Sequence, residues 1–353
     1  MYTGILALVV LAALFFIFLY NSSSSKNNMA ARNSFALGTV IRLKAFGKRG
    51  LAAMDEVILM LNDIDDKMSA FKEYSDVAGV NRNAGIRPHQ VSDETYTVLK
   101  KAVEYCKLTE GAFDPTIRPL VNIWNKGIRQ ELVPDDGLIK EKLPLVNFKD
   151  ILFDDENKTV MLKNKGQEID LGSIAKGYAA DRARDIFIRH KLKSALIDLG
   201  GNIYTLGGKP DDTAWNVGIQ NPFKPRGEYL GILKVKNKSV VTSGNYEKYF
   251  TSDGRRYHHI IDPRTGYPSK SRIISATIIS DNSLDGDGLS TGIYILGAEK
   301  SIELIETLDN IDAILVTEDR KVHLTSGIIK CFELTDDHFY TEINFNREEL
   351  QFI

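Results

Sequence analysis

The chain has 353 residues, 43% of them hydrophobic, so it is long enough to bury one large core or two closely joined ones. Its 45 basic and 47 acidic residues give a formal net charge of -2, which does not favour a nucleic-acid-binding protein. The two cysteines, Cys106 and Cys331, cannot form a disulfide framework, and the absence of a CxxC pair argues against a zinc site.

The N-terminus differs in composition from the rest of the chain. Residues 4–20 carry no charge and are nearly all aliphatic or aromatic, which is short for a membrane-spanning helix and long for the core of a signal peptide. We expect residues 1–20 to form an uncleaved transmembrane anchor, with a cleaved signal as the alternative. Residues 21–33 are expected to form a polar linker, and residues 34–353 the folded domain. Lys26 and Arg32 follow the apolar run, and this bias alone favours a cytoplasmic domain.

The first half of the domain is expected to contain more helix than strand. Apolar residues recur at helical spacing in two segments, and Pro115 is well suited to begin a third helix. The expected elements are a strand over 35–46, helices over 50–66 and 93–108, a helix from Pro115 toward Trp124, and a hairpin over 159–171.

Residues 170–181 indicate a strand end, a glycine turn and the start of a helix that runs to about His190. Ser173 is suited to cap this helix, and the free N–H groups and positive dipole at a helix start suit a phosphate. Lys176 adds a full positive charge in the first turn. The alternative is an ordinary strand-to-helix turn with a solvated lysine.

The second half mixes strands and helices without repeated βαβ units. The expected elements are a buried strand over 195–203 that ends in a glycine bend, short strands between 215 and 259, a tight turn over 262–266, a strand over 273–280, helices over 287–296 and 300–308, and a strand over 313–317. This pattern predicts an α+β fold with mixed or antiparallel sheets flanked by helices.

Three groups of residues could carry chemistry. Asp287 and Thr291 lie four residues apart, so a helix would place their oxygens on one face, where they suit Mg²⁺ better than zinc. The alternative for Asp287 is a simple helix cap. Asp114 and Asp170 stand beside turns and could each act as a base or a hydrogen-bond acceptor, with a local turn contact as the alternative. His258 and His259 are adjacent, so on an extended segment they face opposite sides, and one of them could face a pocket. The sequence has no GxSxG motif and no Cys–His signature, so covalent acyl chemistry has no support.

Taken together, these stretches resemble the FAD:protein FMN transferase family, also called the ApbE family. The resemblance covers roughly residues 35–324 and runs in the order of that family. It is carried by MS at 68–69, SDV at 75–77, Asn81, AFDP at 112–115, DLGSIAKGYA at 170–179, DLGGN at 198–202, HIIDPRTG at 259–266 and DGLST at 287–291.

The resemblance implies an ApbE-like fold, related to the T-fold, and a transferase that acts outside the cytoplasm. It implies Mg²⁺-dependent transfer of FMN from FAD to a Thr or Ser hydroxyl of a flavoprotein, with release of AMP. The flavoprotein is expected to belong to a membrane electron-transport complex. We therefore expect a membrane-anchored enzyme at the periplasmic face of the inner membrane. The alternatives are a pyrophosphatase that splits FAD into FMN and AMP, and a flavin-binding protein without catalysis.

The resemblance also implies which residues do this work. The metal ligands correspond to Ser173, Asp287 and Thr291, with Ser173 acting through its backbone carbonyl. Either Asp170 or His259 could accept the hydroxyl proton, and the sequence leaves this choice open. The flavin-contacting positions correspond to Leu37, Phe71, Ala112, Phe113, Asp114, Asp170, Lys176 and Ile261.

Overall fold

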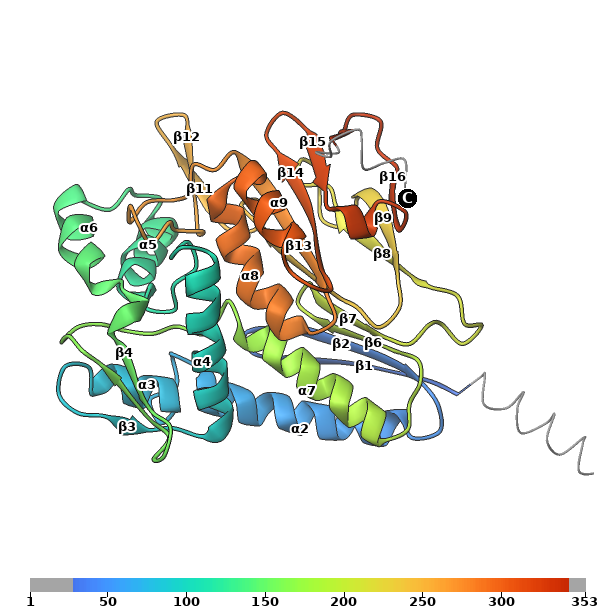
Figure 1. Cartoon of the computed structure of the whole chain (residues 1–353), viewed down its shortest axis with the longest axis horizontal. Helices are drawn as coiled ribbons and strands as arrows, with labels where there is room; N and C mark the ends of the chain where they lie inside the picture. The colour runs from blue at the N-terminus through green and yellow to red at the C-terminus, as the bar shows by residue number, and fades with distance from the viewer. Residues whose placement is uncertain (1–27, 343–353) are drawn as a thin grey trace, which may run out of the picture.

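The main element of the fold is a nine-stranded sheet, seen in a computed structural model that describes residues 28–342 (Figure 1). Its strand order is β1-β2-β6-β7-β10-β13-β14-β15-β17, and neighbouring strands are antiparallel except for β15 and β17. The strands are β1 (Met29–Ala36), β2 (Thr39–Phe46), β6 (Ala195–Leu199), β7 (Asn202–Leu206), β10 (Ser239–Gly244), β13 (Ile273–Ser280), β14 (Ile311–Thr317), β15 (Lys321–Leu324) and β17 (Tyr340–Glu342).

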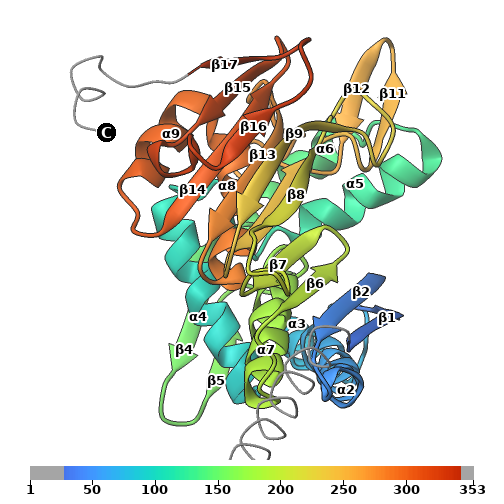
Figure 2. The ribbon, with the colours of Figure 1, turned by 90° about the vertical axis from the view of Figure 1, so that its right-hand side faces the viewer.

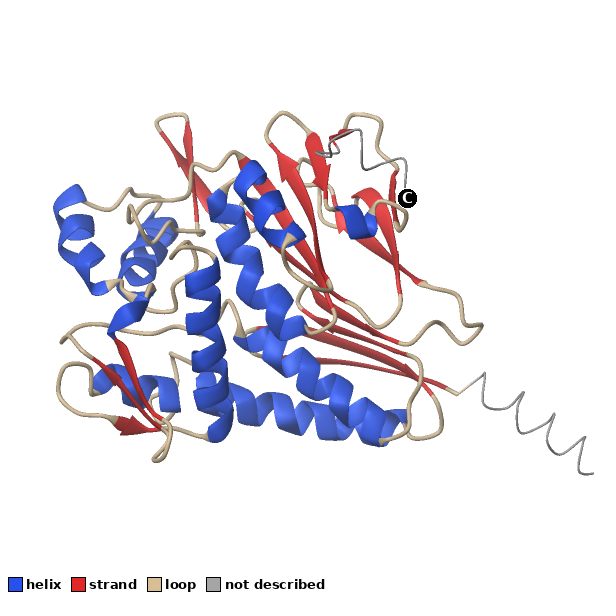
Figure 3. Cartoon of the chain, in the orientation of Figure 1, coloured by secondary structure: helices blue, strands red, loops and turns tan. Residues whose placement is uncertain are grey.

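Smaller sheets and helices surround this sheet, and Figure 3 separates the two kinds of element by colour. The remaining strands form three sheets: β16 (Phe332–Leu334), β9 (Tyr229–Val235) and β8 (Trp215–Gln220); β3 (His89–Gln90), β5 (Thr159–Leu162) and β4 (Ile151–Asp154); and β11 (Tyr249–Ser252) with β12 (Arg255–His258). The helices are α2 (Gly50–Met68), α3 (Asp76–Arg82), α4 (Asp93–Leu108), α5 (Arg118–Gln130), α6 (Asp136–Lys142), α7 (Ala175–Arg189), α8 (Ser283–Leu296) and α9 (Ala298–Glu306).

Both faces of the centre of the large sheet are covered. All eight residues of β13 are buried, as expected for a strand with a layer on each side. Ile278 packs into a core shared with α2, α4, α7 and α8, while Ile279 packs into a second core shared with β8 and β9. Figures 1 and 2 show the helices on one face of the sheet and the β8–β9–β16 sheet on the other. The mixed sheets and flanking helices fit the predicted α+β class.

Helices α7 and α8 pack against each other and fix each other's position. Asn282 precedes α8, but its side chain makes no capping hydrogen bond. Asp181 of α7 caps the helix instead. Its carboxylate accepts the N–H groups of Ser283 at 2.8 Å and Leu284 at 2.9 Å, a favourable place for negative charge. Burial raises the pKa of Asp181 to about 6. The start of α8, and with it the following turn that carries Asp287, is therefore positioned by α7.

Two predicted strands are hairpins. Residues 35–46 form β1 and β2, joined by Leu37 and Gly38, whose φ angles are +51° and +69°. This geometry is a two-residue hairpin turn, and it was missed because leucine rarely adopts it. Residues 195–203 contain β6, the predicted glycine bend at Gly200 and Gly201, and the start of β7, which pairs back onto β6.

Two further boundaries differ from the prediction. The hairpin expected over 159–171 lies earlier, because β5 pairs with β4 and the residues after Leu162 form turns. Strand β1 begins at Met29, before the predicted domain start at residue 34, because its residues pair with β2 from Met29 onward.

The structure corrects the prediction of a membrane anchor. Between residues 28 and 342 no helix is both long and apolar enough to span a bilayer. Helix α2 has 19 residues but carries charged side chains along its length, which a spanning helix excludes. Residues 1–20, on which the anchor was predicted, lie outside the described residues. The transmembrane helix, and the membrane-bound location outside the cytoplasm inferred with it, are not supported.

Candidate active site

A cleft of about 410 Å³ collects most of the residues singled out from the sequence. It lies where the starts of α5, α7 and α8 meet the β6–β7 turn, the end of β10 and the segment after β12. Its lining includes Ala112, Phe113, Asp114, Asp170, Ser173, Lys176, Gly200, Gly201, Asn202, Ser243, Lys248, His259, Ile261, Asp287 and Thr291. Segments that are up to 179 positions apart, from Ala112 to Thr291, therefore share one wall.

Asp287 is the buried carboxylate of the cleft. Its side chain is only 5% exposed, and its Oδ2 accepts the Gly177 N–H at 2.8 Å. Its Oδ1 faces the Lys176 ammonium at 3.8 Å, longer than a hydrogen bond, so this oxygen can take a further partner. Thr291 lies one helical turn later, and its Oγ1 is 3.4 Å from the Ser243 Oγ. The pair has the shared helix face that the spacing predicted.

The start of α7 is less open than the sequence suggested. The residue before the helix is Ile174, not Ser173, and it provides no side-chain cap. The N–H groups of Ile174 and Ala175 both bond to the Leu171 carbonyl, and the Gly177 N–H bonds to Asp287. The predicted Ser173 cap was therefore wrong, because a tight backbone turn already satisfies these donors. Ser173 nevertheless lines the cleft.

Gly177 allows α7 and α8 to approach at the site. A Cβ added there would lie 2.3 Å from the Ser283 carbonyl oxygen and 2.7 Å from the Asp287 Cβ, both too close. We expect Gly177→Ala to lower the free energy of unfolding by about 1–3 kcal/mol, the usual cost of overpacking, and to reduce activity by displacing Asp287.

Chemical denaturation and a transfer assay measure the two effects of this change. Arg182→Ala, an exposed change on the same helix, is the control, with an expected effect within about 0.5 kcal/mol. A Gly177→Ala protein as stable and active as the parent would contradict this interpretation of the contact.

Asp170 is held by an ion pair. Its Oδ2 accepts the Arg118 Nη1–H at 2.9 Å, and its Oδ1 accepts the Gly172 N–H at 2.8 Å. Arg118 also donates to the Ala70 carbonyl at 2.9 Å and lies 4.6 Å from the centre of the Phe71 ring. Both oxygens of Asp170 therefore already accept a hydrogen bond, and the arginine connects the cleft to Phe71.

Asp114 is satisfied by the protein itself. Its two oxygens accept the N–H and hydroxyl of Thr116, at 2.8 and 2.6 Å, and the Phe148 N–H at 2.9 Å. Burial raises the pKa of this carboxyl above its usual range, while these hydrogen bonds act in the opposite direction. Asp114 thus shapes the wall that Ala112 and Phe113 line, and its described contacts are structural.

His259 lines the cleft, and a backbone carbonyl fixes which of its ring nitrogens carries the hydrogen. Its Nδ1 is 3.2 Å from the Lys248 carbonyl, and since a carbonyl only accepts, Nδ1 carries the hydrogen. The Nε2 of the neutral ring then keeps its lone pair. Burial lowers the pKa of His259 below its ordinary value of about 6.5, so the neutral form dominates at pH 7. This is the form that a general base requires.

Of three further residues predicted to contact the flavin, one lines the cleft and two do not. Ile261 is 5% exposed and lines the cleft. Leu37 lies in the β1–β2 turn, packed against the main core, and Phe71 is 78% exposed beneath Arg118. Neither Leu37 nor Phe71 is part of the cleft wall, so their contact with a flavin stays a prediction.

Several residues at the cleft had no predicted role. Asn202 is 2% exposed, and its Oδ1 accepts the Ser283 hydroxyl at 2.6 Å. Its Nδ2 is buried and has no hydrogen-bond partner among residues 28–342, and the residue itself lines the cleft. The DLGGN stretch pointed to this asparagine, but Ser243 and Lys248 of the wall carried no comparable sequence signal, nor did Arg118, which pairs with Asp170. A buried amide donor without a partner costs about 1–3 kcal/mol, which a ligand oxygen would recover.

The sequence and the fold agree with one family of known proteins. The ApbE family model matches residues 37–315. A Treponema pallidum protein named FAD:protein FMN transferase is 36% identical, over 88% of this chain and 91% of its own length. A Klebsiella pneumoniae protein of the same name is 37% identical, over 86% and 93%.

Solved structures agree with this assignment. The ApbE protein of Thermotoga maritima superposes with a TM-score of 0.79 at 32% identity, covering 86% of this chain and 99% of its own. The flavin transferase ApbE of Vibrio cholerae superposes with a TM-score of 0.78 at 27% identity, with the same coverage. By sequence, by fold and by the residues gathered in the cleft, the chain belongs to the ApbE family.

Proposed function

We infer that the protein is an FAD:protein FMN transferase. The family membership and the names of its relatives support this function. The observation within the structure that carries it is the meeting of Asp287, Thr291, Lys176 and His259 in one cleft. Transfer of a phosphate-linked group to a hydroxyl needs three kinds of group. These are oxygen donors, a cation beside the phosphates and an unprotonated imidazole that accepts the hydroxyl proton.

The donor set fits a magnesium ion. Asp287 Oδ1, Thr291 Oγ1 and the backbone carbonyl of Ser173 are all oxygens, which Mg²⁺ prefers, and they include no sulfur or imidazole ligand. Among residues 28–342, the nearest partner of Asp287 Oδ1 is the Lys176 ammonium at 3.8 Å, although the carboxylate is buried, and a cation bound there would offset the cost of this burial. Bound there, Mg²⁺ would neutralise negative charge on the diphosphate of FAD.

The protein's own groups account for holding the diphosphate. Lys176 donates to the Gly172 carbonyl at 2.7 Å, which anchors its ammonium at the cleft wall. The Asn202 Nδ2 offers a second donor without a partner among the described residues. Arg118 keeps Asp170 in place and stacks on Phe71, which positions one end of the cleft for the flavin. Together they orient FAD while water is displaced.

The reaction then joins FMN to a protein hydroxyl. The oxygen of a Thr or Ser of the acceptor flavoprotein attacks the FMN-side phosphorus, and the bond from that phosphorus to the AMP oxygen breaks. His259 Nε2 accepts the hydroxyl proton, because Asp170 already accepts hydrogen bonds on both oxygens. AMP leaves with the electron pair of the broken bond. The nucleophile comes from the acceptor, in agreement with the lack of a nucleophile motif.

A mass measurement tests the proposal. The full chain is incubated with FAD, Mg²⁺ and a flavoprotein acceptor, and the acceptor is analysed by mass spectrometry. We expect a covalent FMN adduct on a Thr or Ser and one AMP per adduct. Free FMN formed at the same rate with and without the acceptor would instead favour an FAD pyrophosphatase. FAD binding without any turnover would favour a non-catalytic flavin-binding protein.

A further inference from the structure

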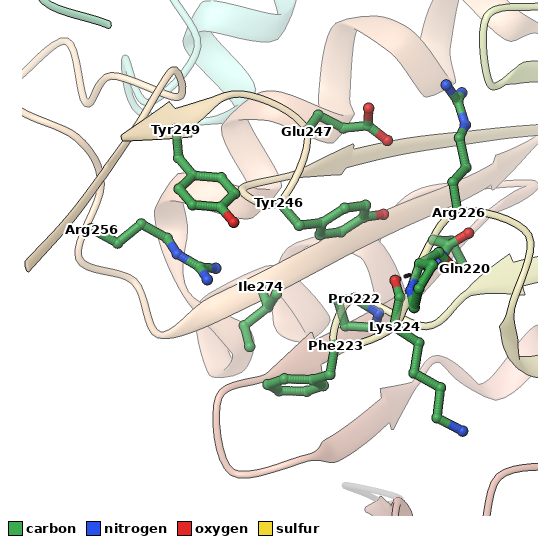
Figure 4. Close-up of a pocket in the computed structure, with 11 residues that line it drawn as sticks. Gln220, Pro222, Phe223, Lys224, Arg226, Tyr246, Glu247, Tyr249, Arg256 and Ile274 are labelled. Carbon is green, nitrogen blue, oxygen red and sulfur yellow. Dashed lines mark hydrogen bonds between the residues drawn. The ribbon is translucent and has the colours of Figure 1, made fainter. Parts of the chain in front are cut away.

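Two adjoining hollows lie next to the cleft, and residues of the β11–β12 hairpin line both of them. The first, of about 430 Å³, is lined by Gln220, Pro222, Phe223, Lys224, Pro225, Arg226, Tyr246, Glu247, Tyr249, Arg256 and Ile274 (Figure 4). The second, of about 550 Å³, shares Phe223, Arg256 and Ile274 with the first. We call the two together the basic groove.

The basic groove carries more cations than carboxylates. Its walls contribute Lys224, Arg226, Arg255, Arg256, Lys270 and Arg272, against Glu247 and Glu318. Lys224 is paired with Asp336 at 2.9 Å, and Arg272 lies 3.9 Å from Glu318. Arg226, Arg255, Arg256 and Lys270 are exposed, and none of them has a carboxylate partner within residues 28–342. For a chain with a net charge of -2, this is a local excess of positive charge.

Aromatic rings stand between these cations. Arg256 lies 4.2 Å from the centre of the Tyr249 ring, and Arg255 lies 5.2 Å from that of Tyr257. Figure 4 shows Tyr249 and Arg256 on one side of the first hollow and Arg226 on the other, with Tyr246 between them. Such a surface offers flat apolar contact and charged donors together, as protein-binding surfaces do.

The basic groove and the catalytic cleft share one lining residue, and at a second place successive residues of the chain line the one and the other. Glu247 lines both the first hollow and the cleft. Tyr257 and His258 line the second hollow, and the next residue, His259, lines the cleft. The carbonyl that holds His259 belongs to Lys248, next to Glu247. A polypeptide lying in the groove would therefore pass close to the imidazole that receives the acceptor proton.

We propose that the basic groove binds an acidic, extended segment of the acceptor flavoprotein and so delivers its hydroxyl to His259. This rests on the proposed function, which requires another protein to reach the cleft. The complementary charge supports an acidic segment, since four cations are left without a carboxylate partner of the described chain. Attraction of this kind would raise the rate of encounter and fix the direction in which the segment lies.

Peptide binding tests the proposal without FAD. The probe is a labelled peptide with one threonine followed by a run of aspartates, and its control has asparagines in their place. With the full chain, we expect the aspartate peptide to bind at least about tenfold more tightly, with a difference that shrinks at high salt. In the double variant Arg226→Glu, Arg256→Glu, the preference should be lost. The matched variant Lys48→Glu, Arg49→Glu, exposed before α2, should keep it.

FAD affinity, measured in the same variants, separates this proposal from the proposed function. We expect it to be unchanged in Arg226→Glu, Arg256→Glu, because neither side chain lines the cleft. Equal binding of the two peptides, or binding unaffected by the groove variant, would overturn the groove proposal alone. Weaker FAD binding in that variant would also overturn it, by assigning the groove to the dinucleotide. A parent protein that transfers no FMN would reject the proposed function, whatever the peptides do.

Discussion

Replacing Asp287 by asparagine is expected to lower the rate of FMN transfer by about 10²–10³-fold, the usual loss when one preorganised electrostatic group is removed. Asparagine keeps an oxygen that can accept the Gly177 N–H, so the α7–α8 contact should survive. It removes the negative charge that would hold a cation beside Thr291 and that balances Lys176 at 3.8 Å. The rate should therefore fall while the protein remains folded. Steady-state transfer rates over a range of Mg²⁺ concentrations measure the effect.

A neighbouring carboxylate gives the control for this change. Asp285 lies on the same helix, but its Oδ1 accepts the Tyr105 hydroxyl at 2.5 Å, and it does not line the cleft. Asp285→Asn should therefore leave the dependence of the rate on Mg²⁺ unchanged. If Asp287→Asn retained the parental rate and Mg²⁺ dependence, the metal site proposed here would be wrong.

Replacing His259 by glutamine is expected to slow transfer to the protein acceptor by about 10²–10⁴-fold, the contribution of a positioned general base. FAD binding should change little, since glutamine can still donate to the Lys248 carbonyl. In the parent, burial lowers the pKa of His259, so the rate should fall as pH decreases through a midpoint below about 6.5. This acidic limb should disappear in His259→Gln. The pH dependence of kcat/KM checks both statements.

The adjacent histidine separates this role from a structural one. His258 is buried against Tyr294, its Nε2 is 3.2 Å from the Ser269 carbonyl, and burial lowers its pKa to about 4. His258→Gln should reduce stability but keep the pH profile of transfer. An acidic limb that persisted in His259→Gln, or one with a midpoint above 6.5, would exclude His259 as the base.

Local signals in the sequence were enough to predict the long amphipathic helices. Helix α4 has the predicted bounds, and α2 extends two residues beyond its predicted end, because their buried residues recur at helical spacing. Turns that depend on an unusual backbone were missed. Leu37 adopts a left-handed conformation that its side chain disfavours, so the β1–β2 hairpin looked like one strand. The cap at Ser173 failed for a similar reason, because the Leu171 carbonyl already satisfies the donors of that turn.

The sequence predicted those parts of the candidate site in which the reactive side chains lie close together in the chain. It did not predict contacts between residues that only the arrangement of the strands brings together. Asp287 and Thr291 share a helix face, which their spacing alone predicts. The Arg118–Asp170 ion pair joins positions far apart in the chain, so no local sequence pattern predicts it. The same holds for the Lys248 carbonyl that fixes the His259 tautomer, because β11 and β12 bring these residues together. Such contacts follow from the topology of the sheets.

The location of FAD in a crystal grown with FAD and Mg²⁺ would show whether the cleft between α7 and α8 holds the diphosphate while His259 faces the incoming hydroxyl. We expect the diphosphate beside Lys176, with a metal ion bound to Asp287 and Thr291. A diphosphate bound outside this cleft, with Asp287 and Thr291 free of metal, would contradict this expectation.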